Sequence, residues 1–308
     1  TDRWCATGPG RTFSHRLSQA ANIVRNPLRG MSAPPFDVIH STYSRMPRRV
    51  RGLSGAKVMT VHDITALRLP LNMLGATQRA VTKRIIDSIR PTDWLAFVSD
   101  HARNDFLDYK NHPEHRTRTI YNGVDAGAFR PPSDPSFVDA VLERHGLAKR
   151  PFLMTLSSLA PHKNLDVIAR AWPRVLQRFP QAQLLIAGGK SVDTATLWET
   201  ASHYAREGVV FAGFIPDTEF VALASQCSAF LFPSLYEGFG LPPLEAMACG
   251  APVIASNRTA VQEVLAGAAT LIDPEDAEAW AVAGEAALTT PVSDRKSTRL
   301  NSSHEWIS

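Results

Sequence analysis

Short apolar runs alternate with amphipathic segments along the second half of the chain. The runs predict strands at residues 152–156, 184–187, 209–211, 229–232, 253–255 and 270–272. Apolar residues three and four positions apart predict a helix that Asn164 caps, with the face Leu165, Ile168, Trp172, Leu176 and Phe179. Asp217 is expected to cap a second helix, and the alanine-rich residues 277–288 predict a third. Strands that alternate with helices predict a parallel sheet.

The first half has the same pattern in a weaker form. Apolar runs predict strands at residues 37–40, 57–62, 94–98 and 119–121, and residues 78–89 predict a helix. Prolines between residues 129 and 150 predict a linker that holds one short helix at 137–145. The whole pattern predicts an α/β protein of two Rossmann-like, doubly wound domains that face a cleft. We place them at residues 1–130 and 151–293, with the linker at 131–150.

Composition places the chain among soluble globular proteins. It has 308 residues, of which 44% are hydrophobic and 20% charged, and no apolar run approaches a membrane span. Three cysteines and no visible signal peptide favour a reducing, cytoplasmic location. The formal net charge is +4, and Arg45, Arg48, Arg49 and Arg51 form a basic cluster. This cluster fits either acidic headgroups or phosphates, or a solvated loop. No zinc-ligand spacing, P-loop or nucleic-acid module is visible.

Both ends of the chain are unusual. It begins at Thr1 and lacks the opening apolar strand and glycine-rich loop of a doubly wound domain, so we expect the N-terminal domain to be truncated. Residues 294–308 match the translation of a common sequencing adapter, so we expect them to be an artefact that packs on nothing. Missing strands leave open sheet edges, and we therefore expect the chain as written to be poorly soluble and inactive.

Residues 231–250 contain the strongest chemical signal. Glu237 and Glu245 are eight positions apart, and a glycine-rich turn followed by Pro242 and Pro243 separates them. A proline suits the first turn of a helix, whose free N–H groups bind anions, while ionised carboxylates accept hydrogen bonds from sugar hydroxyls. This combination fits a nucleotide-diphospho-sugar, with phosphates at the helix end and one sugar at each glutamate. Two surface glutamates on a strand–loop–helix connection are the alternative.

The E-G-F-G-L-P string from Glu237 and the A-C-G-x-P-V-I-A-S string at 248–256 resemble the E-x7-E signature of retaining GT4-type glycosyltransferases of the GT-B fold. Residues 58–63 resemble that family's T-x-H-D strand end, and residues 156–165 resemble its lysine loop. Residues 37–40, 97–103 and 120–125 resemble further scaffold segments. The resemblance covers about residues 36 to 290.

The resemblance implies a role for each matching residue. As catalytic residues, His62 would bind a hexose hydroxyl, Lys163 would neutralise the leaving diphosphate, and Glu237 would hold the hexose. Glu245 would hold the ribose. The other donor-binding candidates are Ser99, Ser158, Gly188, Gly238, Phe239, Gly240 and Leu241. Many family members have an arginine where Ser157 and Ser158 stand here, which leaves His162 or Ser158 as a weaker contributor. No metal and no cofactor is expected.

The implied reaction moves a hexose from a nucleotide diphosphate to a hydroxyl acceptor with retained configuration, the leaving phosphate taking the acceptor's proton. GDP-mannose is the first expectation for the donor and a UDP-hexose the second. The acceptor would be an oligosaccharide or a lipid-linked sugar of polysaccharide or glycolipid biosynthesis, with peripheral contact at the inner membrane face. An epimerase of the same fold and an inactive nucleotide-sugar-binding subunit are the alternatives.

Overall fold

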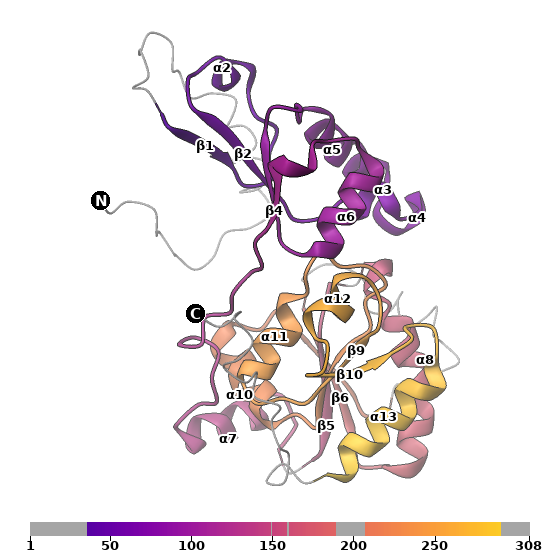
Figure 1. The fold of residues 1–308 in the computed structure, drawn as a ribbon. Coiled ribbons are helices and arrows are strands. Elements are labelled where there is room, and N and C mark those ends of the chain that lie inside the picture. Colours follow the sequence, from indigo (N-terminus) through magenta and orange to yellow (C-terminus); the bar gives the residue numbers. More distant parts are fainter. Residues whose placement is uncertain (1–35, 149, 159, 189–206, 291–308) are drawn as a thin grey trace.

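The computed structural model describes residues 36–148, 150–158, 160–188 and 207–290, and it shows two parallel β-sheets with helices around them (Figure 1). We call the part built on the first sheet the first domain and the part built on the second sheet the second domain. The expected N-terminal truncation and the expected adapter segment at 294–308 fall on residues outside these ranges.

The first domain has the parallel strand order β1-β2-β3-β4. Its strands are β1 (Val38–Ser41), β2 (Ala56–Val61), β3 (Trp94–Phe97) and β4 (Thr117–Thr119). Its helices are α2 (Arg48–Arg51), α3 (Thr65–Arg68), α4 (Leu71–Leu74), α5 (Ala76–Asp87) and α6 (Asp100–Tyr109), with a 3-10 turn at Glu114–Arg116. Ile86 of α5 and Phe106 of α6 pack with the strand residues Met59, Leu95 and Phe97 in one core.

The second domain has the parallel strand order β10-β9-β8-β5-β6-β7. Its strands are β5 (Phe152–Leu156), β6 (Gln183–Ala187), β7 (Val209–Gly213), β8 (Ala229–Phe232), β9 (Val253–Ser256) and β10 (Thr270–Ile272). Its helices are α7 (Pro135–Arg144), α8 (Leu165–Arg178), α10 (Asp217–Gln226), α11 (Leu241–Ala248), α12 (Thr259–Val264) and α13 (Ala277–Thr289), with a 3-10 turn, η2, at Pro161–Lys163.

Helices cover both faces of the second sheet. Alternate strand residues, such as Leu184 and Leu231, pack against α8 and α13 on one face. Their neighbours, such as Leu185 and Phe230, pack against α7, α10 and α11 on the other face. This is the doubly wound arrangement that the alternating pattern predicts, and the strands are continuous apolar runs because both faces are buried.

The direction of the strand order reverses between β5 and β8. Strands β5, β6 and β7 follow one another to one edge, whereas β8, β9 and β10 follow one another to the opposite edge. In open parallel sheets, ligands bind beyond the carboxyl ends of the strands at such a reversal. The loops that leave β5 and β8 are therefore the first place to look for a site.

Several local predictions are wrong. Asn164 holds the predicted N-cap position of α8, but its side chain does not cap the helix. Its backbone is left-handed, and its side-chain amide donates to the carbonyls of Pro233 (3.1 Å) and Pro274 (2.7 Å). Asp217 is the first residue of α10, and Pro216 holds the cap position. Strand β4 ends at Thr119, where the predicted strand begins.

The linker helix α7 packs on α10, with Arg144 and His145 both contacting Glu219.

The basic cluster does not form a single surface. The side chain of Arg51 is only 6% exposed and binds Asp93, 3% exposed, through both carboxylate oxygens at 2.6 Å. Arg51 also donates to the carbonyl of Ser88 at 2.6 Å, whereas Arg45 and Arg48 are exposed. Arg51 therefore neither binds headgroups or phosphates nor lies in a solvated loop, so both alternatives are wrong for this residue. Its ion pair with Asp93 instead holds α2 against the first domain's sheet. None of the described helices is both long and apolar enough to cross a membrane.

Candidate active site

The loops that follow β5 and β8 bring two predicted catalytic residues into contact. Lys163 ends η2 after β5, and Glu237 lies in the turn after β8. The ammonium Nζ of Lys163 donates to Glu237 Oε1 at 2.5 Å, and the two side chains are 22% and 15% exposed. An ammonium group has three N–H donors, so Lys163 can hold this carboxylate and still bind an anion.

The turn 238–241 presents unused backbone donors. Within the described residues, the amides of Gly238, Phe239, Gly240 and Leu241 donate no hydrogen bond. Gly240 precedes α11 with φ of 99°, a left-handed conformation that glycine adopts without strain. Pro242 and Pro243 have no N–H, so the donors at this helix end come from residues 238–240 and from Leu241, the first residue of α11. Successive free amides of this kind form a concave anion site.

The predicted donor residues in this turn contribute differently. The Phe239 side chain is only 5% exposed, belongs to the core and packs near Tyr121 with ring centroids 6.2 Å apart. The Phe239 ring is therefore not available to a ligand. Leu241 is partly buried and begins α11. Gly238, Phe239 and Gly240 are buried with their backbone included, whereas Leu241 is partly exposed.

Glu245 lies on α11 and is half-buried, and its carboxylate makes no hydrogen bond or ion pair within the described residues. Burial, and secondarily the charge of Asp217, raises the pKa of its carboxyl group. A half-buried carboxylate without a partner is costly, so it gains free energy from any ligand that donates hydrogen bonds. Glu245 is not paired with Lys163, in contrast to Glu237.

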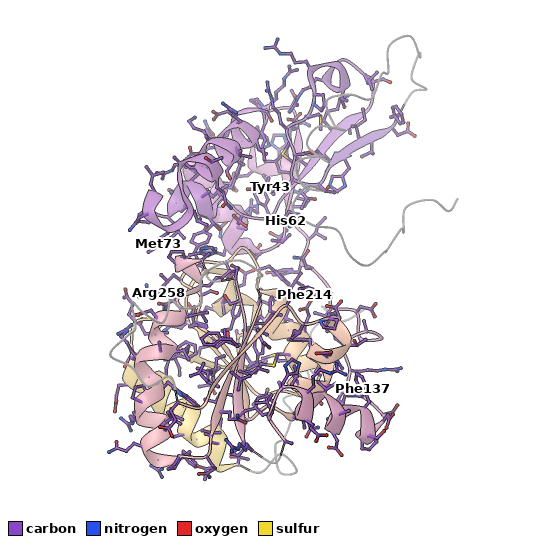
Figure 2. All side chains as sticks on the ribbon, turned by 180° about the vertical axis from the view of Figure 1, so that it is seen from behind. Tyr43, His62, Met73, Phe137, Phe214 and Arg258 are labelled. Carbon is purple, nitrogen blue, oxygen red and sulfur yellow. The ribbon has the colours of Figure 1, made fainter. Side chains whose placement is uncertain are left out.

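The first domain contributes residues that follow β2. His62 is exposed, and its ring meets the ring of Tyr43 edge-on at 5.7 Å between centroids. Figure 2 shows both residues at the end of the first domain that faces the second domain. The Tyr43 hydroxyl donates to the carbonyl of Asp63 at 2.5 Å, and burial, aided by Asp63, raises the pKa of Tyr43. Tyr43 has φ of 72°, a strained conformation of the kind found at functional sites.

Gly238 lies directly against the backbone of His62. A Cβ atom on Gly238 would be 2.1 Å from the carbonyl oxygen of His62 and 2.8 Å from Cβ of Asp63. No side chain fits in that space. The glycine is therefore required for the turn after β8 and the end of β2 to meet.

Ser99 does not reach a ligand as predicted. Its side chain is fully buried, accepts a hydrogen bond from the Ala102 amide at 3.0 Å and donates to the carbonyl of Gly238 at 2.7 Å. The hydroxyl proton of Ser99 is used in the hydrogen bond to Gly238 of the second domain. Ser99 thus joins the start of α6 to the turn after β8 and is not available as a donor-binding residue.

Gly188 and Ser158 lie at the carboxyl ends of β6 and β5. Gly188 has φ of 124°, and a Cβ there would be 2.1 Å from the carbonyl oxygen of Ser157. Gly188 is therefore needed because the backbone of Ser157 lies against it, not because a ligand does. Ser158 is exposed, and its carbonyl accepts from the Ser157 hydroxyl at 2.6 Å. Neither serine supplies the positive charge of an arginine.

His162 lies beside the ion pair. Its Nδ1 is buried and has no hydrogen-bond partner in the described part of the chain. Burial, and then the neighbouring Lys163, lower its pKa, while Glu237 and Asp63 act in the opposite direction. His162 is therefore neutral at neutral pH and adds no second cation next to Lys163.

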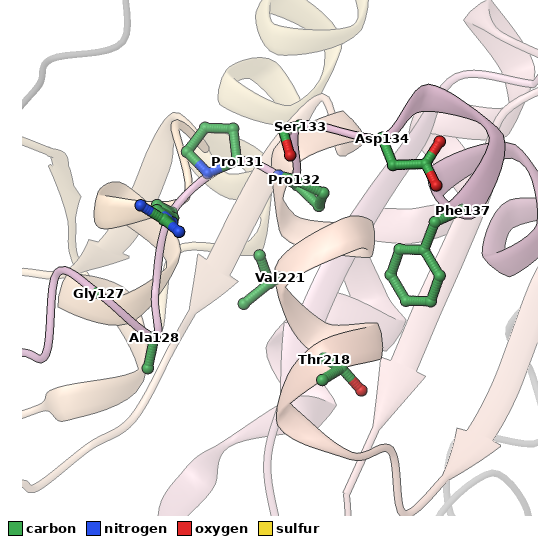
Figure 3. Close-up of a pocket in the computed structure, with 10 residues that line it drawn as sticks. Gly127, Ala128, Pro131, Pro132, Ser133, Asp134, Phe137, Thr218 and Val221 are labelled. Carbon is green, nitrogen blue, oxygen red and sulfur yellow. The ribbon is translucent and has the colours of Figure 1, made fainter.

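A separate cavity of about 690 Å³ lies away from these residues. The segment 127–134, Phe137 of α7, and Thr218 and Val221 of α10 line it (Figure 3). It contains none of the predicted site residues. In the described ranges, no three His, Cys, Asp or Glu residues gather in a way that could hold a metal ion.

Two known families match the chain. Residues 139–304, more than half of the chain, match the family described as glycosyl transferases group 1. The chain belongs to this family. Residues 6–127 match the family described as glycosyltransferase family 4.

This glycosyltransferase is similar to curated mannosyltransferases. It is 29% identical over 247 residues to O-antigen chain mannosyltransferase B of Escherichia coli, a match that covers 79% of this chain and 62% of that protein. It is 30% identical over 293 residues to a GDP-mannose-dependent alpha-(1-6)-phosphatidylinositol monomannoside mannosyltransferase of Mycolicibacterium smegmatis, covering 83% of this chain and 74% of that protein. The chain spans less than two thirds of the E. coli relative.

The fold is that of solved glycosyltransferases. WaaG, a glycosyltransferase involved in lipopolysaccharide biosynthesis, superimposes with a TM-score of 0.70 at 19% sequence identity, over 96% of this chain and 80% of that chain. The predicted GT-B architecture of two Rossmann-like domains is confirmed. At this level of identity the likeness concerns the fold alone.

Sequence reasoning missed the roles of Asp63, Tyr43 and Thr259, because tertiary contacts define them, whereas the segment 213–215 with Phe214 resembles family loops near the nucleobase and phosphates. The hydroxyl of Tyr43 donates to the carbonyl of Asp63, which is 20 positions away. The hydroxyl of Thr259 accepts from the amide of Glu237, which is 22 positions away. Phe214 follows β7 and is 69% exposed, which is unusual for a phenylalanine. Figure 2 shows it at the end of the second domain that faces the first. The sequence signal for it is an aromatic residue directly after a strand-ending glycine.

Proposed function

We propose that this glycosyltransferase transfers a hexose from a nucleotide diphosphate to a hydroxyl acceptor with retention of the anomeric configuration. One observation carries the proposal. The cation of Lys163 and the carboxylate of Glu237 gather where the strand order of the second sheet reverses, beside the turn 238–241, whose amides donate no hydrogen bond in the described part of the chain. Positive groups for a diphosphate and a carboxylate for a sugar then lie within one site.

Breaking the sugar–phosphate bond builds negative charge on the leaving diphosphate. Lys163 and the amides of the turn are fixed donors that stabilise this charge without reorganisation. The acceptor oxygen bonds to the anomeric carbon on the face that the phosphate leaves, and its proton passes to the departing phosphate oxygen. Glu237, held by Lys163, is assigned to hexose binding and not to nucleophilic attack.

Three further residues are assigned to the hexose, the ribose and the nucleobase of the donor. His62, exposed at the end of β2, is assigned to a hexose hydroxyl. Glu245, half-buried and unpartnered in the described chain, is assigned to the ribose hydroxyls. The exposed ring of Phe214 is assigned to the nucleobase, because aromatic rings stack on bases of any identity.

Mannose carried by GDP is the proposed donor, with a UDP-hexose as the second candidate. The support is the similarity to two curated mannosyltransferases, one of which is named as GDP-mannose-dependent. The proposed acceptor is an oligosaccharide or a lipid-linked sugar, since the same two names refer to an O-antigen chain and a phosphatidylinositol mannoside. The proposed place of action is the cytoplasmic face of the membrane.

One observation favours a different function, that of an inactive nucleotide-sugar-binding subunit. Ser157 and Ser158 stand where many family members have an arginine, and His162 adds no positive charge. A panel of GDP- and UDP-sugars offered to the full-length protein distinguishes the two. Release of free nucleotide together with a glycosylated acceptor supports the enzyme. A thermal shift with every donor tested and no release of nucleotide contradicts it.

Glu245→Ala is expected to weaken donor binding more than turnover. The loss of hydrogen bonds to a buried charge costs about 1.5–3 kcal/mol, or roughly 10- to 150-fold in dissociation constant. Titration calorimetry with the donor nucleotide measures this change.

The pH dependence gives the control for this assignment. Because burial raises the pKa of Glu245, its ionised fraction grows as the pH rises through that raised value. Donor affinity should increase over the same rise, and Glu245→Gln should abolish the increase. Donor affinity that is unchanged in Glu245→Ala refutes the ribose assignment.

A further inference from the structure

A carboxylate of the second domain holds the start of a helix in the first domain. Glu263 lies on α12, and its Oε1 and Oε2 accept hydrogen bonds from the amides of Asp100 (2.8 Å) and His101 (2.7 Å). These are the first two residues of α6. Figure 1 shows α6 directly above α12, at the junction of the two domains.

The contact satisfies groups that a helix cannot satisfy itself. The first amides of a helix have no acceptor within the helix, and a negative charge is favourable there. Glu263 takes the first two amides of α6, and Ser99 takes the third, that of Ala102. Ser99 then donates its own proton to Gly238. Two side chains thus link the start of α6 to two separate segments of the second domain.

The other end of α12 holds the donor-site turn. Thr259 begins α12, and its Oγ1 accepts a hydrogen bond from the amide of Glu237 at 3.1 Å. Thr259 has φ of 56°, and a β-branched residue in this left-handed conformation is a strained outlier. Such strain persists only where surrounding contacts determine it. Helix α12 therefore contacts Glu237 at one end and the first domain at the other.

A second contact closes the same junction. The hydroxyl of Tyr236, the residue before Glu237, donates to the carboxylate of Asp105 on α6. The ring of Tyr236 also meets that of His101 edge-on at 5.6 Å between centroids. Segments on both sides of the Lys163–Glu237 pair are thus tied to α6, while Gly238 lies against His62.

We propose that Glu263 is a positioning residue that holds the first domain over the donor site, so that His62 faces the hexose bound at Glu237. It acts through α6 and touches no substrate. The effect on transfer rests on the proposed function, whereas the effect on domain arrangement does not.

The test is Glu263→Gln, which keeps the size of the side chain but removes the charge and one acceptor. The full-length variant is expected to have a larger radius of gyration by small-angle X-ray scattering. Its kcat/KM for hexose transfer should fall by about tenfold or more, because one hydrogen bond between the domains is lost and the other is no longer charge-assisted. GDP affinity should not change, since the groups assigned to the nucleotide lie in the second domain.

Glu143→Gln is the matched control, because Glu143 is exposed on α7 and away from the junction. It should change neither the radius of gyration nor transfer. Glu263→Asp keeps the charge but is one methylene shorter, and it should show the changes of Glu263→Gln to a smaller degree. An unaltered radius of gyration in Glu263→Gln overturns the proposal, as does a parallel loss of GDP binding. If no hexose is transferred even by the unsubstituted protein, the proposed function fails, while the scattering data still decide the role of Glu263.

Discussion

Lys163→Met is expected to lower hexose transfer by about 10²–10³-fold, the effect of removing one fixed group that stabilises transition-state charge. Lys163 supplies the positive charge at the donor turn and is paired with Glu237 at 2.5 Å. Its removal also leaves the Glu237 carboxylate, only 15% exposed, without its cation and close to the expected diphosphate. Steady-state kinetics with the donor and acceptor measure both consequences, with a lower kcat and a higher KM for the donor.

Two further variants test the reason for this loss. Lys83→Met removes an exposed lysine of α5 that is paired with Asp87, and it should leave transfer unchanged. In the double variant Lys163→Met/Glu237→Gln, the unpaired charge is gone, so donor KM should rise by less than the two single effects combined, while kcat stays low. If Lys163→Met retains full kcat, the assignment of the leaving-group charge to Lys163 is wrong.

Asp93→Ala is expected to destabilise the first domain by about 3–5 kcal/mol, because it leaves the buried guanidinium of Arg51 without its partner. Both side chains are almost fully buried, and Asp93 also accepts a hydrogen bond from the Arg90 amide at 2.8 Å. Denaturant unfolding followed by circular dichroism measures the change.

An exposed pair in the same domain provides the comparison. Asp87→Ala breaks the surface contact with Lys83, four residues away on α5, and should cost only about 0.3–0.5 kcal/mol. Equal effects of the two substitutions would contradict the structural role given to Arg51. A large difference between them confirms that Arg51 stabilises the fold and is not part of a membrane-facing basic surface.

The sheets could be predicted from sequence because their strands are buried on both faces. Strands β5 and β8 are buried and almost entirely apolar, and for both of them and for the edge strand β10 the predicted ranges match the observed bounds. The short helices α2, α3 and α4 have four residues each, too few for a periodic pattern to appear. They form because tertiary contacts, such as that between Arg51 and Asp93, stabilise them.

The candidate site also has residues that the sequence predicts and residues that it does not. The motif around Glu237 and the lysine loop identify residues at the reversal of strand order, and the structure brings Lys163 and Glu237 into contact. The sequence did not predict that Ser99 would be buried between the domains or that Glu263 would hold α6. Both depend on residues more than 130 positions apart along the chain. Local patterns carry no information on contacts of that kind.

The anomeric configuration of the product tests the central proposal most directly. The full-length protein is incubated with GDP-α-mannose and an oligosaccharide acceptor, and NMR spectroscopy of the first product reports the new linkage. We predict release of GDP and an α-linked mannoside. A β-linked product, or no nucleotide release from any GDP- or UDP-sugar, would contradict retaining hexose transfer at the Lys163–Glu237 site.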